Sequence, residues 1–386
     1  MTQDIRDFVP ASCELLGLGE PTHREPAFGW IRNELLPPLV EHGFRSIALE
    51  IDRVAAMTVN DYVLGDPGVL EDVVREGFSH EWGELEFNRR LVQWLRDHNN
   101  THLPADRVTF HGFDAPTENY SAPSPRTYLE YARDYLGLDL DVAGLAGDDH
   151  RWSRQESVLD PAMSPGATPE AKQLRALGED MLFALYRRAP ELVAATSRAE
   201  WFRAETHLTG GLALLRYHAQ CAEPLPQHER LTPLILARDT IMAQNLLAIR
   251  RLEADRGPTL VFSHNLHLQP GRTSMPVADQ DHSWSNAGAI IDALGVIDYT
   301  FIAGSLGRSA SFELEAPESD TYEGLLDAHT ATWGFSPAAP ITAGRQRADV
   351  MPHGHFPLTL DLLARADAVL HIGDGSACRR DFEPVL

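Results

Sequence analysis

The chain has 386 residues, of which 43% are hydrophobic, and a formal net charge of −23 at pH 7. Because so acidic a surface repels phosphate backbones, we expect no nucleic acid among its partners. No apolar run is long enough to cross a bilayer, and the first residues lack a basic start followed by an apolar signal core. Three widely spaced cysteines predict neither a disulfide framework nor a metal knuckle. We therefore expect a cytoplasmic protein, monomer or homodimer, that binds no membrane.

The first part of the chain alternates between apolar runs, which are typical of buried strands, and stretches with helical spacing of apolar residues. This βαβ rhythm predicts a parallel sheet with helices on its faces. We expect strands over residues 13–20, 44–52 and 107–116, and helices over residues 25–41 and 84–99.

The pattern changes to continuous helix from about residue 128 to residue 255. Strands are expected again over residues 258–268, 298–307 and 367–373, whereas residues 311–355 read as long loops with one short helix near 322–328. The predicted fold class is α/β: a central, mainly parallel sheet flanked by helices, with an inserted all-helical subdomain covering the site. We expect residues 1–124 and 256–386 to form the α/β catalytic core and residues 125–255 the helical subdomain.

The stretch "GLGEPT" after the first strand matches the first two glycines of a dinucleotide-binding motif. Thr22 stands where the third glycine belongs, and Glu20 would place a carboxylate beside the pyrophosphate. This repulsion excludes a nucleotide site here.

Polar residues lie at or just beyond the carboxyl ends of several predicted strands, which meet in one crevice of an open α/β sheet. Two carboxylates beside a histidine suit general-base hydrolysis, because they fix the tautomer of the imidazole and raise its pKa. Each residue also has a structural interpretation: Glu20 could cap the next helix, Glu50 could pair with an arginine, and Arg32 could be a helix-surface charge. The polar residues at or just beyond these strand ends are Glu20, His23, Glu50, Asp114, His264 and His267, and Arg32 lies on the predicted helix after the first strand.

The motifs "LGEPTH", "GFRSIALE", "WLRDHN", "FHGFD" and "SHNLH" follow one another in this order. Together they resemble the erythromycin esterase family over residues 15–114 and 258–268. The resemblance implies hydrolysis of the macrolactone ester of macrolide antibiotics. Many relatives carry an acidic residue four positions after the histidine, where this chain has Ala27, and Glu25 follows His23 by only two positions.

The resemblance also implies roles for individual residues. His23 is the expected general base, Glu20 and Glu50 are its carboxylate partners, and His264 assists at the carbonyl or leaving oxygen. Arg32 and His267 also match functional positions of the family. Together with Glu25 and Asp114, which are not among these positions, they are the expected substrate contacts. The expected substrate is a bulky, apolar small molecule such as a macrolide, with Trp82, Phe78 and Trp152 as candidate walls of the pocket.

Two other functions remain open from the sequence. A divalent metal bound by Glu20, His23, Glu50 and His264 would make the protein a metal-dependent hydrolase or peptidase of similar fold, although we expect no cofactor. A non-catalytic protein that binds haem or a metabolite is the second alternative. It is less favoured because a binder has no need of two buried carboxylates around a histidine.

Overall fold

The computed structural model describes residues 2–118, 120–277, 280–310, 313–348 and 354–382. Within these ranges one sheet of seven strands has the order β3-β2-β4-β1-β7-β9-β8. All neighbouring strands pair in parallel except β8, which runs antiparallel to β9 at one edge. The strands are β1 (Leu15–Glu20), β2 (Ser46–Asp52), β3 (Thr109–Asp114), β4 (Thr259–His264), β7 (Tyr299–Arg308), β8 (Trp333–Pro337) and β9 (Ala368–Asp374).

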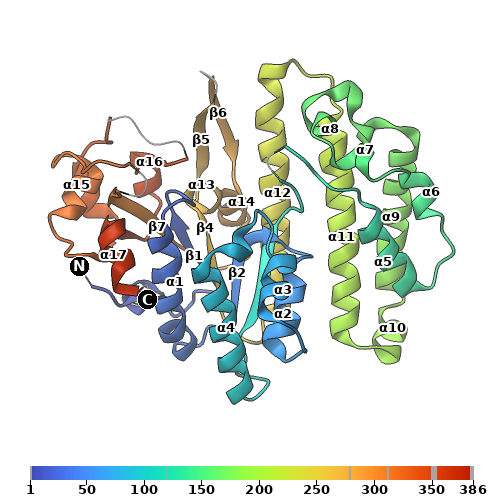
Figure 1. Cartoon of the computed structure of the whole chain (residues 1–386), viewed down its shortest axis with the longest axis horizontal. Helices are drawn as coiled ribbons and strands as arrows, with labels where there is room; N and C mark the ends of the chain where they lie inside the picture. Colours follow the sequence, from blue (N-terminus) through green and yellow to red (C-terminus); the bar gives the residue numbers. More distant parts are fainter. Residues whose placement is uncertain (1, 119, 278–279, 311–312, 349–353, 383–386) are drawn as a thin grey trace.

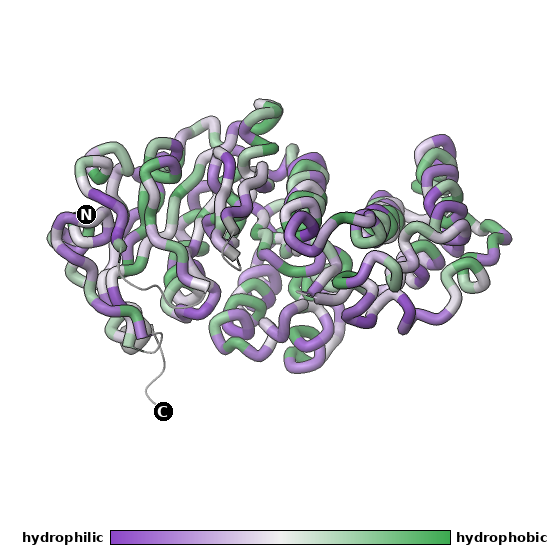
Figure 2. Tube along the Cα trace, turned by 90° about the horizontal axis from the view of Figure 1, so that it is seen from above, coloured by the Kyte–Doolittle hydropathy of each residue, from purple (hydrophilic) through white to green (hydrophobic). Residues whose placement is uncertain are grey.

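Both faces of this sheet are covered by helices, which explains why the inner strands are apolar on both sides. Alternate residues of β1, such as Leu16 and Leu18, pack with the helices on one face, whereas Leu15 joins the core on the other. In Figure 2 the inner strands are mostly hydrophobic and the helices around them alternate in hydropathy. The helices that alternate with the strands are α1 (Pro26–Glu41), α2 (Ala56–Leu64), α3 (Leu70–Gly77), α4 (Glu86–Thr101), α13 (Asn265–Leu268), α14 (Ala287–Leu294), α15 (Tyr322–Asp327), α16 (Leu360–Leu363) and α17 (Gly375–Phe382).

The expected helical segment forms a separate layer with its own hydrophobic core. Figure 1 shows α5, α9 and α11 on the far side of α12 from the sheet. The long helix α12 packs against both β3 and α11, so it joins the two parts. None of the helices in the described ranges is long and apolar enough to span a membrane. The helices of this segment are α5 (Arg126–Leu136), α6 (Val142–Ala146), α7 (His150–Ser153), α8 (Glu156–Leu159), α9 (Pro169–Arg187), α10 (Ala189–Ala195), α11 (Arg198–Cys221) and α12 (Gln227–Glu253).

The α/β fold class with a mainly parallel sheet is confirmed, but three details of the C-terminal half differ from the prediction. The region expected as loops with one helix also contains β8, which completes the sheet edge by pairing with β9. The strand expected over 258–268 ends at His264, because His264 caps the short helix α13 by accepting a hydrogen bond from the Leu266 N–H. A hairpin of β5 (Arg272–Val277) and β6 (Gln280–Ser285) was not predicted. The domain boundaries given above stay a prediction.

The two glycines of "GLGEPT" are explained by packing inside β1. A side chain at Gly19 would place its Cβ 2.0 Å from Oδ1 of Asn265, and one at Gly17 would lie 2.6 Å from the Tyr299 hydroxyl. Asn265 bridges to the next strand, since its Nδ2 donates to the Gly304 carbonyl and its Oδ1 accepts the Gly304 N–H. Gly19 therefore makes room for a buried amide bridge, and Gly17 makes room for the Tyr299 side chain.

Gly19→Ala is expected to lower the free energy of unfolding by about 1–3 kcal/mol, the usual cost of overpacking a tight core. The new methyl group has to displace the Asn265 amide from Gly304. Urea denaturation measures this loss of unfolding free energy. In the double variant Gly19→Ala/Asn265→Ala the loss should be smaller than the sum of the losses in the two single variants. A Gly19→Ala protein as stable as the wild type would contradict this account.

Candidate active site

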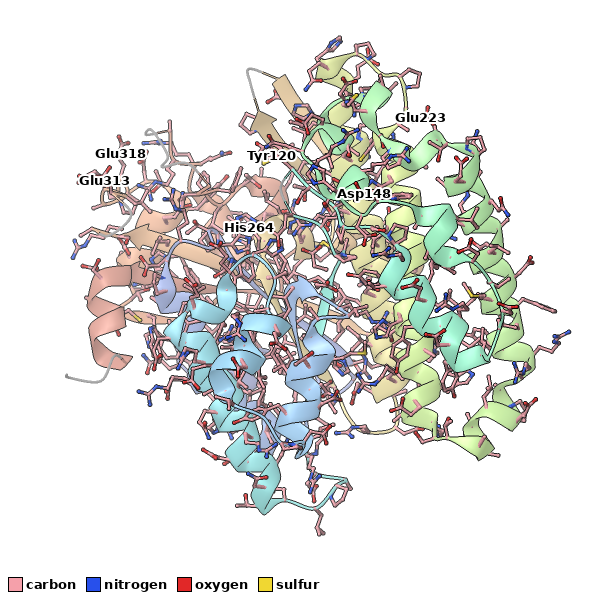
Figure 3. The ribbon with its side chains drawn as sticks, turned by 45° about the vertical axis from the view of Figure 1, so that its right-hand side comes forward. Tyr120, Asp148, Glu223, His264, Glu313 and Glu318 are labelled. Atoms are coloured by element: carbon pink, nitrogen blue, oxygen red, sulfur yellow. The ribbon has the colours of Figure 1, made fainter. Side chains whose placement is uncertain are left out.

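The candidate site lies at the carboxyl ends of β3, β2, β4 and β1, which are neighbours in the sheet. Glu20 ends β1 and is paired in register with His264, the last residue of β4. In β2 the register with β3 shifts between Leu49 and Asp52, and Glu50 lies within this irregularity. Bulges of this kind often redirect a side chain near a functional site. Figure 3 shows His264 deep in the centre of the molecule, whereas Glu313 and Glu318 lie at its outer edge.

His23 lies between two carboxylates. It belongs to the turn between β1 and α1, and its Nδ1 is 2.7 Å from Oε1 of Glu20. Its Nε2 is 3.6 Å from Oε1 of Glu50. The two carboxylates are almost completely buried, whereas the His23 side chain is 32% exposed. The imidazole is therefore the member of this trio that a substrate can reach.

The carboxylates change the protonation of the imidazole. Burial by itself lowers the pKa of His23, but Glu50 and Glu20 stabilise the imidazolium and raise this pKa to about 10. Burial also raises the pKa of the Glu20 carboxyl, and the hydrogen bond from His23 opposes that shift. A proton is thus held tightly between Glu20 and His23 in the resting site.

Glu50 is the anionic centre of the site. Its Oε2 accepts hydrogen bonds from the Ser263 hydroxyl (2.6 Å) and from the His264 N–H (3.1 Å). Its Oε1 accepts one from Arg238 (2.9 Å). Burial favours the neutral acid, but His267, His23 and Arg238 hold the pKa of Glu50 well below its usual range. Glu50 is therefore a permanent carboxylate around which the cations are arranged.

His267 lies between the carboxylates of Glu50 and Asp239. Its Nε2 is 3.4 Å from Oε1 of Glu50, and its Nδ1 is 2.8 Å from Oδ1 of Asp239 on α12. Asp239 also accepts hydrogen bonds from the Trp284 indole and the Ala287 N–H. Burial disfavours the imidazolium, but Asp239 and Glu50 outweigh it and raise the pKa of His267. Its orientation is consequently fixed.

His264 is a neutral histidine packed against His23. The two ring centroids are 5.2 Å apart in an edge-to-face arrangement, and Phe356 lies 5.3 Å from His264 on another side. Burial and the positive charge of His23 lower the pKa of His264 well below its usual range. Nδ1 accepts the Leu266 N–H, so Nε2 carries the proton. Within the described ranges this buried Nε2 has no hydrogen-bond partner.

Arg32 of α1 lies beneath His23 and is 1% exposed. Its guanidinium donates to the side chains of Asn88 and Asn33, and lies 5.0 Å from the ring centroid of Phe262. Burial lowers its pKa to about 9, although Glu20 opposes this shift. Together with Glu20 and His23, Arg32 lines a small cavity of about 20 Å³. It is a buried cation under the site, and the interpretation as a helix-surface charge is wrong.

A larger cavity of about 630 Å³ opens above His23 and Glu50. Its wall includes His80, Glu81 and Trp82 from the turn between α3 and α4, and the Trp82 ring centroid is 4.8 Å from that of His23. His80 and Glu81 both have a φ of 60°, which is uncommon for residues other than glycine and often marks a functional site. His80 is held there by Glu118 and Asp114.

Glu25 and Asp114, two of the expected substrate contacts, are buried and form hydrogen bonds within the protein. Glu25 is 2% exposed; it caps α1 through the Ala27 N–H and accepts a hydrogen bond from the Ser309 hydroxyl. Asp114 is fully buried and binds Arg238 through both of its oxygens. Of the candidate walls, only Trp82 lines the cavity; Phe78 and Trp152 belong to hydrophobic cores.

The sequence analysis missed Arg238, Asp239 and His80. Arg238 and Asp239 are consecutive residues of α12, inside the segment expected to be only a helical cover. Their signal in the sequence is a charged pair within "LILARDTIMAQNLLAI", an otherwise largely apolar helix. Charged residues are rarely fully buried unless they are paired, and Asp239 is completely buried here.

The candidate metal ligands are arranged for hydrogen bonding. Glu20 and His23 bond to each other, Glu50 accepts from three donors, and Nδ1 of His264 already accepts the Leu266 N–H. Among the described residues, no group of three or more histidine, cysteine, aspartate or glutamate side chains has an arrangement that could hold a metal ion.

Fold and site together define an α/β protein with a histidine flanked by carboxylates at the edge of its sheet. The model of the erythromycin esterase family matches residues 39–372. The chain belongs to this family, whose membership supports an esterase-type hydrolase. Glu50, His264 and His267 lie within the matched residues, whereas Glu20, His23 and Arg32 precede them.

Solved structures with the same fold include three with low sequence identity. A protein from Bacillus cereus has a TM-score of 0.69 at 16% identity, over 96% of this chain and 90% of its own. A mutant of the erythromycin esterase EreC in its open conformation has a TM-score of 0.66 at 17% identity, over 94% and 91%. A succinoglycan biosynthesis protein has a TM-score of 0.62 at 17% identity, over 96% and 90%. No curated protein matches the sequence.

Proposed function

We propose that the protein hydrolyses a carboxylic ester, with a macrolactone as the natural target and His23 as the general base. The observation that carries the proposal is the position of His23: its Nδ1 is fixed by Glu20, its Nε2 lies near Glu50, and the ring borders the large cavity. Family membership adds to this, because the related erythromycin esterase EreC has the same fold.

The proposed reaction starts from neutral His23. Nδ1–H donates to Glu20, which leaves the lone pair of Nε2 free to take a proton from water. The water oxygen then bonds to the ester carbonyl carbon, and the carbonyl oxygen becomes an oxyanion. When the intermediate collapses, the C–O bond to the alcohol breaks and the leaving oxygen takes the proton from His23. The products are a carboxylic acid and an alcohol.

The proposed substrate is a bulky, apolar small molecule such as a macrolide. A cavity of about 630 Å³ is within the usual size range of small-molecule sites, and Trp82 offers an apolar surface beside His23. A panel of macrolides and simpler lactones, analysed by mass for the gain of one water, tests this proposal. If no member of a broad ester panel gained water, ester hydrolysis would be the wrong function.

We propose that this reaction needs no metal, and that Glu20, His23, Glu50 and His264 act through hydrogen bonds. The occupied Nδ1 and enclosed Nε2 of His264 support this. Protein dialysed against EDTA should keep the activity of untreated protein. Loss of activity that a divalent ion restores would favour a metal-dependent hydrolase.

The pH dependence of kcat/KM is expected to report the raised pKa of His23. A base must be deprotonated, so kcat/KM should rise with pH until the imidazolium has lost its proton, at an apparent pKa well above 6.5. Glu20→Gln removes an anion that stabilises the imidazolium and should move this limb to lower pH. Glu318→Gln, at the outer edge of the molecule, is the matched control and should leave it unchanged. A limb at or below pH 6.5 in the wild type would contradict the assignment.

A further inference from the structure

The Arg238 guanidinium is held firmly at the wall of the cavity. Its Nε and Nη2 bind the two oxygens of Asp114 at 2.9 and 2.6 Å, and Nη2 also donates to Oε1 of Glu50 at 2.9 Å. Bidentate pairing of this kind fixes a guanidinium plane as well as its charge. Because Asp114 is completely buried, the pair ties α12 to the end of β3.

One part of this guanidinium is left for a ligand. Nη1 carries two N–H groups, and its only hydrogen-bonding neighbour among the described residues is Nε2 of His267, at 3.4 Å. The Arg238 side chain is 27% exposed and lines the same cavity as His23 and Trp82. At least one N–H of Nη1 therefore has no partner among the described residues, in a side chain that borders the space where a substrate would lie.

Arg238 and His23 approach the same oxygen atom. Oε1 of Glu50 is 2.9 Å from Nη2 of Arg238 and 3.6 Å from Nε2 of His23. A small group in the cavity above this oxygen can contact the imidazole on one side and the guanidinium on the other. This is the arrangement that an attacked carbonyl needs: a base for the water and a fixed donor for the oxygen.

His264, the residue expected to assist at the carbonyl, is less well placed. It is 5% exposed, and its protonated Nε2 is enclosed by protein. It does not border the large cavity, whereas Arg238 does. In this arrangement a substrate oxygen meets Arg238 first.

We propose that Arg238 is a catalytic residue that binds the carbonyl oxygen of the ester and stabilises the oxyanion formed when water attacks. The proposal rests on the ester hydrolysis proposed above. As the C=O π electrons move to oxygen, the Nη1–H donates to the growing negative charge, and when the charge returns the C–O bond to the alcohol breaks. Arg238 gives up no proton in this step, so all proton transfer stays with His23.

The first test replaces Arg238 in enzyme that hydrolyses an ester. Arg238→Met is expected to lower kcat by about 10²–10³-fold, as loss of an oxyanion donor does elsewhere, with a much smaller change in KM. Arg238→Met combined with Asp114→Asn keeps the buried charge balanced and should be equally slow. Arg216→Met, on an exposed face of α11, is the matched control. A double variant within threefold of wild-type kcat would overturn the proposal.

Chemical rescue separates catalysis from a structural effect. Adding guanidinium, below denaturing concentration, to Arg238→Ala protein should restore activity several-fold, because the free cation can occupy the vacated space. It should leave the wild type and the Arg216→Met protein unchanged. Equal response of all three proteins would overturn the proposal.

The second test measures binding without turnover. Ethyl phenylphosphonate carries one negative charge on a tetrahedral group, like the intermediate, and its affinity can be measured by calorimetry. We expect binding to the wild type and at least a tenfold loss in Arg238→Met. Equal affinity, or no binding to the wild type, would overturn the role of Arg238. If the wild type hydrolysed no ester yet showed this Arg238-dependent binding, the proposed function would fail and the anion contact would stand.

Discussion

Replacing His23 with asparagine is expected to lower kcat/KM for ester hydrolysis by about 10²–10⁴-fold, the usual contribution of a general base. Asparagine can still accept or donate a hydrogen bond at Glu20, but it cannot take a proton from water. The His23 side chain is partly exposed in a turn, so the fold should survive. Initial rates on the best ester of the panel, together with a thermal melt, measure both properties.

His228→Asn is the matched control for this experiment, because its side chain is 60% exposed and lies at the start of α12. It should behave like the wild type. If His23→Asn retained ordinary activity while correctly folded, another group would have to be the base, and the mechanism proposed here would be wrong.

Glu50→Gln is expected to damage both stability and catalysis. Removing this charge leaves Arg238, His23 and His267 each without one of two anionic partners in a buried setting. Breaking a buried ionic network in this way costs about 3–5 kcal/mol of unfolding free energy. The same change removes a carboxylate that raises the pKa of His23, so any residual activity should reach its plateau at lower pH.

Urea denaturation measures the loss of stability, and kcat/KM as a function of pH measures the second effect. Glu86→Gln is a suitable control: Glu86 forms an exposed pair with Arg90 on α4, and such pairs contribute about 1 kcal/mol or less. A Glu50→Gln protein as stable as this control would show that the buried cations do not depend on Glu50.

Helix α12 contributes two charged residues that hold the site together. The helix supplies Arg238 to Glu50 and Asp114, and Asp239 to His267. Residues of α12 also form part of the core that covers one face of the sheet. Helix α12 belongs to the all-helical segment, yet its position decides whether Arg238 reaches Glu50 and whether Asp239 reaches His267.

Much of the fold could be predicted because local patterns determine it. The strands β1, β2 and β4 are buried over nearly their whole length, so they appear in the sequence as continuous apolar runs bounded by turns. The hairpin β5–β6 and the edge strand β8 lack this signal. Their residues are mixed in polarity, and pairing with a partner strand decides their conformation.

Some residues of the candidate site could likewise be predicted from local patterns, and others could not. Glu20, Glu50, Asp114 and His264 could be grouped because each lies at or near the carboxyl end of a predicted strand, and the structure brings them to one edge of the sheet. Glu25 was grouped with them for its nearness to His23 in sequence, but the backbone turns it into the cap of α1 instead. Sequence distance does not reveal the direction of a side chain.

The sequence by itself determined the parallel sheet, the helical segment and the strand ends at or just beyond which His23 and its two carboxylates lie, because hydrophobic periodicity and chain order are local properties. Only the tertiary structure decided that Arg238 and His80 reach the same cavity and that His264 is enclosed. These facts depend on how α12 and the turn after α3 pack over the sheet. Such packing brings together residues far apart in the chain, and no local pattern records it.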